Sequence, residues 1–162
     1  MSNQLSVVLI IGLPGTGKTT LGERFASLLG WTLITTERIR ADLFGSETVT
    51  EDRDFTPDEI AITYRAVSLL ARHLLSAGAS IVVDGVFRSH EQRQLILDVA
   101  KDAGATFLGV HTTCSELVVI ERLTKRKTLG TVSPAGAIGY QKIKNEFEPI
   151  DPSFIRVDTS SS

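Results

Sequence analysis

The chain has 162 residues, of which 42% are hydrophobic and 22% charged, and its formal net charge is −2. This balance is typical of one globular domain with a hydrophobic core, and the charge argues against a bulk nucleic-acid binder. The single cysteine, Cys114, excludes an intrachain disulfide and a cysteine metal cluster. The sequence shows neither a signal peptide nor an apolar run near the roughly 20 residues of a membrane span, so we expect a cytoplasmic protein.

Apolar runs and helical periodicity alternate along the chain. Leu5–Ile11 is a nearly continuous apolar run, which is typical of a strand buried on both faces. From Lys18 the apolar residues recur at helical spacing until Gly30. The elements predicted after it are a strand over 31–35, a helix over 37–44, a loop over 46–55, a helix over 57–77, a strand over 80–84, a helix between Ser89 and Gly104, a strand over 106–111, a helix ending at 125–127, a loop over 128–134, a helix ending near 147 and a strand over 154–158.

Several predicted helices begin with a capping signal. A hydroxyl side chain stands three residues before a Glu or Gln, the pattern of a capping box. The three pairs are Thr56 with Glu59, Ser89 with Gln92, and Thr113 with Glu116.

This alternation predicts the α/β fold class. Strands that alternate with helices form βαβ units, and therefore a mostly parallel five-stranded sheet with helices on both faces. Right-handed crossovers place the loops at the carboxyl ends of the strands along one edge, where ligands bind. No repeat and no linker interrupts the chain, so we expect residues 1–162 to form one domain.

The residues after the first predicted strand form a phosphate-binding motif. Gly12, Gly17, Lys18 and Thr19 match G-x-x-x-x-G-K-[ST] at every fixed position, between a buried strand and an amphipathic helix. The glycines let successive N–H groups point at a phosphate, and the helix start adds the positive end of its dipole. We expect Lys18 to reach the β and γ phosphates of ATP and the Thr19 hydroxyl to bind Mg²⁺. The predicted nucleotide-binding residues are Gly12, Leu13, Pro14, Gly15, Thr16, Gly17, Lys18, Thr19 and Thr20.

A dinucleotide-binding fingerprint is the nearest alternative motif. It does not fit, because Thr20 stands where the third glycine of G-x-G-x-x-G should be, counted from Gly15. The motif and its context therefore favour a three-layer P-loop NTPase fold.

The strand over 80–84 ends at Asp84, which is followed by Gly85. This strand should lie beside the P-loop, so Asp84 is placed to hold Mg²⁺ through water. Gly85 offers no side chain to position an attacking water. We therefore expect phosphoryl transfer to an acceptor rather than rapid hydrolysis.

Two charged residues follow the second predicted strand. Glu37 and Arg40 are three residues apart, so a helix that starts here places them on one face. A carboxylate near the γ-phosphate can accept a proton from an acceptor hydroxyl, and the arginine can hold an anionic or polar group of that acceptor. Arg88, just after Asp84, is a further candidate for acceptor contact.

The basic segment ERLTKRK places Arg122 and Arg126 on one helix face, ahead of a glycine- and serine-containing stretch. We expect a small lid over about 124–136, and we expect the two arginines of the basic helix that leads into it to neutralise charge in the transition state. The alternative is an ordinary basic face near a helix C-terminus, where cations are favoured in any case.

With these motifs in place, the chain resembles the small P-loop kinases of the AAA_33 type, which are related to polynucleotide 5′-hydroxyl kinases, chloramphenicol phosphotransferase, gluconate kinase and zeta toxins. The resemblance runs from about Val7 to Asp158. It rests on the order and spacing of four segments: GLPGTGKTTL, ITTERIRADLFG, LLSAGASIVVDGVFRSHEQRQLILDVAKDAGATF and ERLTKR.

The resemblance implies ATP and Mg²⁺ as cofactors, a parallel core with strand order 2-3-1-4-5, and phosphoryl transfer to a hydroxyl. It also implies that an aspartate and an arginine after the second strand serve the acceptor, at the positions of Glu37 and Arg40. Lid arginines map to Arg122 and Arg126. Glu37 departs from the family pattern, because it stands where aspartate is usual.

The expected function is therefore transfer of the γ-phosphate of ATP to a hydroxyl of a small-molecule acceptor, with Lys18, Glu37, Arg122 and Arg126 as catalytic residues. Two alternatives stay open. A polynucleotide 5′-hydroxyl kinase would need a basic groove leading to Glu37, which the near-neutral charge does not favour. A module that binds ATP without transferring phosphate would not need the pair Glu37 and Arg40.

Overall fold

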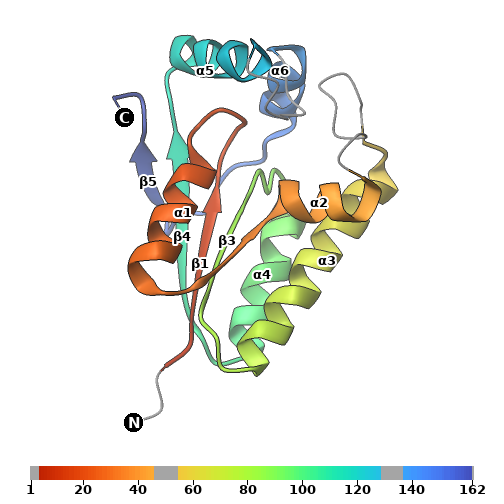
Figure 1. Ribbon diagram of the computed structural model, residues 1–162, viewed down its shortest axis with the longest axis vertical. Coiled ribbons are helices and arrows are strands. Elements are labelled where there is room, and N and C mark those ends of the chain that lie inside the picture. The colour runs from red at the N-terminus through yellow and green to blue at the C-terminus, as the bar shows by residue number, and fades with distance from the viewer. Residues whose placement is uncertain (1–3, 46–54, 129–136, 162) are drawn as a thin grey trace.

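The computed structural model describes residues 4–45, 55–128 and 137–161, so the loops predicted over 46–55 and 128–134 lie largely outside the described residues. Strands and helices alternate as expected (Figure 1). The element bounds are β1 Ser6–Ile11, α1 Lys18–Leu29, β2 Thr32–Thr35, α2 Thr36–Phe44, α3 Pro57–Ser76, β3 Ile81–Gly85, α4 His90–Asp102, β4 Thr106–Thr113, α5 Glu116–Thr128, α6 Ala137–Glu146 and β5 Ile155–Asp158.

The strands form one five-stranded sheet in the order β2-β3-β1-β4-β5. Every neighbouring pair is parallel. The α/β class and the strand order implied by the resemblance are both confirmed. Because β1 is central, the P-loop that follows it opens at the middle of the carboxyl edge of the sheet.

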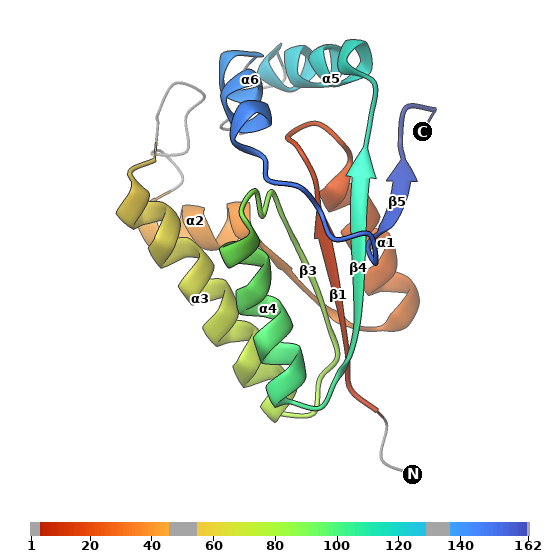
Figure 2. The ribbon, with the colours of Figure 1, turned by 180° about the vertical axis from the view of Figure 1, so that it is seen from behind.

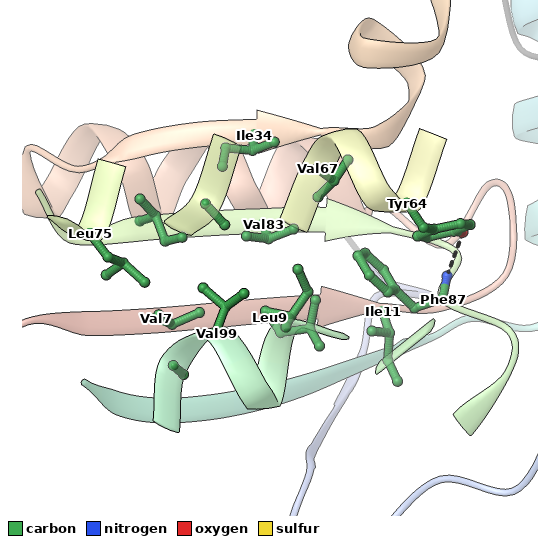
Figure 3. Packing of buried hydrophobic residues seen from close by; sticks show 14 residues of the cluster. Val7, Leu9, Ile11, Ile34, Tyr64, Val67, Leu75, Val83, Phe87 and Val99 are labelled. Carbon is green, nitrogen blue, oxygen red and sulfur yellow. Dashed lines mark hydrogen bonds between the residues drawn. The ribbon is translucent and has the colours of Figure 1, made fainter. Parts of the chain in front are cut away.

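Alternating residues of β1 build two apolar cores, one on each face of the sheet. Val7, Leu9 and Ile11 join the larger core with residues of α3 and α4, which Figure 3 shows from close by. Val8 and Ile10 face the opposite way and pack with residues of α1. Figures 1 and 2 show α1 on one face of the sheet and α3 and α4 on the other, which makes three layers.

The helices α5 and α6 lie beyond the carboxyl ends of the strands (Figure 1). They stand over the edge at which β1 and β3 end, so residues of α6 can form a wall of any site there. In the described ranges, no helix is both long and apolar enough to cross a membrane.

Two of the three predicted capping boxes are present. Thr56 and Ser89 each accept a hydrogen bond from the third residue of the following helix, whose side chain bonds back to the cap. The prediction for Thr113 is wrong, because Thr113 is the last residue of β4 and α5 begins at Glu116. The backbone carbonyl of Thr113 accepts a bond of 2.9 Å from Thr159 N instead, so the strand extends two residues past the predicted end at His111.

Candidate active site

The P-loop lies against the end of β4. A Cβ atom at Gly12 would lie 2.4 Å from the side-chain oxygen of Thr112 and 2.6 Å from its carbonyl oxygen, so the loop approaches too closely for any other residue. Gly17 has a φ of 79° and is the N-cap of α1, a left-handed conformation that glycine adopts without steric cost. The loop therefore turns directly into the helix, whose N-terminus carries the positive end of the helix dipole.

Hydrogen bonds hold the loop in this shape. The Thr16 hydroxyl donates to the Leu13 carbonyl at 2.7 Å and lies 2.8 Å from the Thr112 hydroxyl. Lys18 Nζ donates to the same Leu13 carbonyl at 2.9 Å. The Lys18 ammonium group therefore lies against the P-loop, and we expect it to contact phosphates bound there.

Asp84 lies one strand away from the P-loop, opposite Ile10 of β1. Its side chain is buried, and its Oδ2 atom has no hydrogen-bond partner among the described residues. Burial raises the pKa of Asp84 to about 6, against the opposing effects of Lys18 and a hydrogen bond with Thr19.

This donor set fits Mg²⁺. The ion prefers carboxylate and hydroxyl oxygens and keeps several waters. The Asp84 carboxylate, which interacts with the Thr19 side chain, has one oxygen without a partner among the described residues. Two glycines permit the close packing around Asp84. A Cβ at Gly22 would lie 3.3 Å from Asp84 Oδ2, and one at Gly85 would lie 2.5 Å from the side chain of Thr36.

A cavity of about 320 Å³ joins the P-loop to the predicted acceptor residues. The P-loop and the predicted acceptor residues therefore border one continuous space. Its lining residues include the predicted site residues Pro14, Gly15, Gly17, Lys18, Thr19, Glu37, Arg40, Asp84 and Arg88.

The pair predicted after the second strand is brought to this cavity by α2. Thr35 caps the helix by accepting a bond of 3.3 Å from Arg38 N, which places Glu37 in the first turn. Arg40 follows one turn later, with its guanidinium 4.6 Å from the centre of the Phe55 ring. Burial lowers the pKa of Arg40, and its Nε atom has no hydrogen-bond partner within the described part of the chain.

Arg88 lies on the turn between β3 and α4 and forms an ion pair with Glu146 at the end of α6. The turn is held by its neighbour Phe87, which is fully buried with a φ of 44°. Phe87 N donates to the Tyr64 hydroxyl at 3.1 Å, as the dashed line in Figure 3 shows. The left-handed conformation of a buried aromatic residue is thus fixed by packing and by this bond.

Of the two arginines predicted for the lid, Arg122 has a described side chain, and it is not among the residues that line this cavity. Arg122 donates to the Gly15 carbonyl at 3.3 Å and to the Thr159 carbonyl at 2.7 Å, so it braces the outer side of the P-loop. The side chain of Arg126 and residues 129–136 of the predicted lid lie outside the described residues. A catalytic role for either arginine stays a prediction.

Sequence reasoning missed several residues of the cavity lining. Tyr64, Ile143 and Glu146 line the cavity, and none of them stands in a local pattern that marks a site. Arg93, which lies outside the cavity lining, did carry a signal in the sequence, because it shares the spacing of the apolar residues of α4; the structure shows its side chain 3% exposed. A charged residue on a buried face indicates a specific set of partners.

Comparison with solved structures agrees with the fold. The structure superimposes on the Mycobacterium tuberculosis APS kinase in complex with AMPPNP and APS with a TM-score of 0.69 at 21% identity, covering 98% of this chain and 91% of that one. A gluconokinase from Sinorhizobium meliloti gives a TM-score of 0.70 at 19% identity, covering 97% and 84%. These likenesses show the fold.

Relatives identified by sequence are also named as kinases. A protein of Aeropyrum pernix named probable adenylyl-sulfate kinase is 28% identical over 160 residues, which are 96% of this chain and 84% of that protein. Human 6-phosphofructo-2-kinase/fructose-2,6-bisphosphatase 3 is 26% identical over 131 residues, 74% of this chain and 25% of that much longer protein. The model of the AAA_33 family, described as an AAA domain, matches residues 7–150. The chain therefore belongs to the AAA_33 family and has the fold of the small P-loop kinases.

Proposed function

We propose that the protein transfers the γ-phosphate of ATP to a hydroxyl group of a small-molecule acceptor. The observation that carries this proposal is the shared cavity, which places Lys18 and Thr19 of the P-loop in one space with Glu37 and Arg40 of α2. A site that only bound ATP would have no use for a carboxylate and a buried arginine beside the phosphates.

The nucleotide half of the site would be built from the P-loop. Backbone N–H groups at the start of α1 and the ammonium of Lys18 would hold the phosphates, and the Lys18 bond to Leu13 would be exchanged for phosphate contacts. The Thr19 hydroxyl and Asp84, the latter through water, would hold Mg²⁺, which neutralises phosphate charge when bound.

The acceptor half would be built from α2 and the turn after β3. Glu37 would orient the acceptor hydroxyl and take its proton, and Arg40 would bind an anionic or polar group of the same molecule. Gly85 leaves no side chain to position water beside Asp84, which favours transfer over hydrolysis. The named activities of the relatives, on adenylyl sulfate and on gluconate, favour a small acceptor over an oligonucleotide.

The proposal is tested with Mg-ATP labelled at the γ-phosphate and a panel of acceptors: adenylyl sulfate, gluconate, other sugars, nucleosides, aminoglycosides, chloramphenicol-like alcohols and 5′-hydroxyl oligonucleotides. We expect label in a small acceptor, lost in Lys18→Ala and reduced at least about 100-fold in kcat in Glu37→Gln. Lys125→Ala is the matched control, because Lys125 pairs with Glu121 on the exposed face of α5. Label confined to oligonucleotides, or undiminished transfer by Lys18→Ala, would contradict the proposal.

A further inference from the structure

An ion pair stands inside the acceptor half of the cavity. Arg88 and Glu146 both line the cavity, and their side chains are 26% and 43% exposed. They come from elements 58 residues apart in the sequence, the turn after β3 and the end of α6. The pair is therefore a product of the fold and not of local helix spacing.

The backbones that carry the two side chains are fixed to each other. The Arg88 carbonyl accepts hydrogen bonds of 2.9 Å from Glu148 N and 2.9 Å from Arg93 Nη2. Arg93 also donates to the Glu148 carbonyl at 2.8 Å and to the Pro149 carbonyl at 2.6 Å. The segment that follows Glu146 is thus tied to the turn that carries Arg88, which holds the Glu146 carboxylate close to the Arg88 guanidinium.

A second guanidinium lies close by. Arg40 lines the same cavity, and Arg88 contributes to the lowered pKa of Arg40, as expected of two nearby cations. The Nε atom of Arg40 is buried and has no hydrogen-bond partner in the described ranges. A buried guanidinium donor without an acceptor is a place that an anion would fill.

Glu146 satisfies Arg88 but leaves this donor of Arg40 unsatisfied. An anionic group of an acceptor, with two or three oxygens, could reach both guanidinium groups and restore every bond that Glu146 makes. The exchange would cost little, because a half-exposed carboxylate returns to water easily and exposed ion pairs are weak.

We propose that Glu146 occupies the place of an anionic group of the acceptor, and that an acceptor bearing a carboxylate, sulfate or phosphate binds between Arg40 and Arg88 by displacing it. This inference rests on the proposed acceptor site and names its substrate class. Glu146 is then a specificity-determining residue: it neutralises Arg88 until an anion that can reach both arginines takes its place.

Inorganic sulfate is the probe, and arginine side-chain NMR signals are the readout. Saturating Mg-AMPPNP first fills the P-loop, which also binds anions. The Nε–Hε signals of Arg40 and Arg88, assigned with Arg40→Lys and Arg88→Lys, are then followed during a sulfate titration against sodium chloride of equal ionic strength. We expect both signals to shift together, and Glu146→Gln to lower the half-saturating sulfate concentration about three- to fivefold, since an exposed ion pair contributes about that factor.

Glu121→Gln is the matched control, because this glutamate also pairs with a cation on a helix but lies away from the cavity. Its half-saturation should equal that of the parent protein. Sulfate binding that is unchanged or weaker in Glu146→Gln, or that does not move the Arg88 signal, would overturn the inference. The titration needs no turnover, so its outcome is separate from that of the labelling experiment. The anion site can be refuted while labelled phosphate is still transferred. It can also be supported when no acceptor of the panel is labelled.

Discussion

Asp84 shows how one residue meets two opposing demands. Its carboxylate is buried beside the P-loop, and its Oδ2 atom lacks a hydrogen-bond partner among the described residues. A buried carboxylate disfavours its own ionised form, but Mg²⁺ requires that form. The protein without nucleotide should therefore be less stable because of the carboxylate that the proposed Mg²⁺ site requires.

Asp84→Asn should stabilise the ligand-free protein at neutral pH. The folded-state pKa of about 6 lies above the ordinary value of 3.8, so the native state holds an extra proton between these values and loses stability as pH rises through them. The asparagine variant has no carboxyl group to ionise, so its stability does not fall over this pH range for this reason. Its advantage in the free energy of unfolding should be absent at pH 4, grow towards pH 6 and level off at about 1–3 kcal/mol.

Urea unfolding at several pH values measures this difference. Asp42→Asn, which changes an exposed aspartate of α2, should show no such pH-dependent gain. A gain for Asp84→Asn that is equal at pH 4 and pH 8 would contradict the burial argument.

The affinity for Mg-AMPPNP should fall at low pH for the same reason. Protons compete with the metal for Asp84, whose pKa is about 6, so the Kd should rise about tenfold for each pH unit below this value, provided that the ionised form is required. Calorimetric titrations between pH 5 and pH 8 test this expectation. An affinity that does not change over this range would argue against metal binding by Asp84.

At the residue scale, the candidate site could be predicted where the signal was local. Lys18 and Thr19 of the P-loop, the pair Glu37 and Arg40, and Arg88 all line the cavity, whereas Thr20 does not, and their roles stay predictions. Glu146 was missed, since its place in the site depends on the path of the chain after α6, which no local spacing encodes.

At the scale of elements, Arg93 joins α4 to the segment between α6 and β5. Its side chain is 3% exposed and donates to the carbonyls of Phe87, Arg88, Glu148 and Pro149. A planar guanidinium can serve several acceptors in one plane, which an ammonium group cannot do. The bridge fixes the C-terminal end of α6 against the turn after β3.

Arg93→Met should destabilise the protein by about 3 kcal/mol or more, because buried carbonyl groups would lose their donors. Arg93→Lys should recover only part of this loss. The free energy of unfolding in urea is the measurement, with Arg72→Met as the control. Arg72 is 59% exposed and pairs with Asp102 at 3.7 Å, so its loss should cost less than about 1 kcal/mol. Equal losses for Arg93 and Arg72 would refute the bridging role.

At the scale of the whole molecule, binding at the P-loop should stabilise the entire domain. A ligand at 100 times its Kd adds about 2.7 kcal/mol to the free energy of unfolding, which corresponds to about 5–10 °C in Tm for a domain of this size. We expect this shift with Mg-AMPPNP in a thermal melt. Lys18→Ala should lose most of it and Lys125→Ala should keep it.

The fold was more accessible to sequence reasoning than the site. Alternating apolar runs and helical periods determine the α/β class, because each element has to bury its own apolar face. The strand order came from the resemblance and not from the pattern, since nothing in the residues of β2 says that it pairs with β3. The same limit applies to Arg122, whose contacts with Gly15 and Thr159 depend on how α5 and the end of β5 meet the P-loop.

The brace at Thr159 has a consequence for synthesis on the ribosome. The Thr159 hydroxyl donates to the Thr16 carbonyl at 3.0 Å, across a separation of 143 residues. The ribosome adds Thr159 to the nascent chain many seconds after the residues of the P-loop, at the usual rate of about 5–20 residues per second. Until β5 has emerged from the ribosome and docked, the P-loop lacks this support, so a growing chain cannot complete its nucleotide site before Thr159 is available.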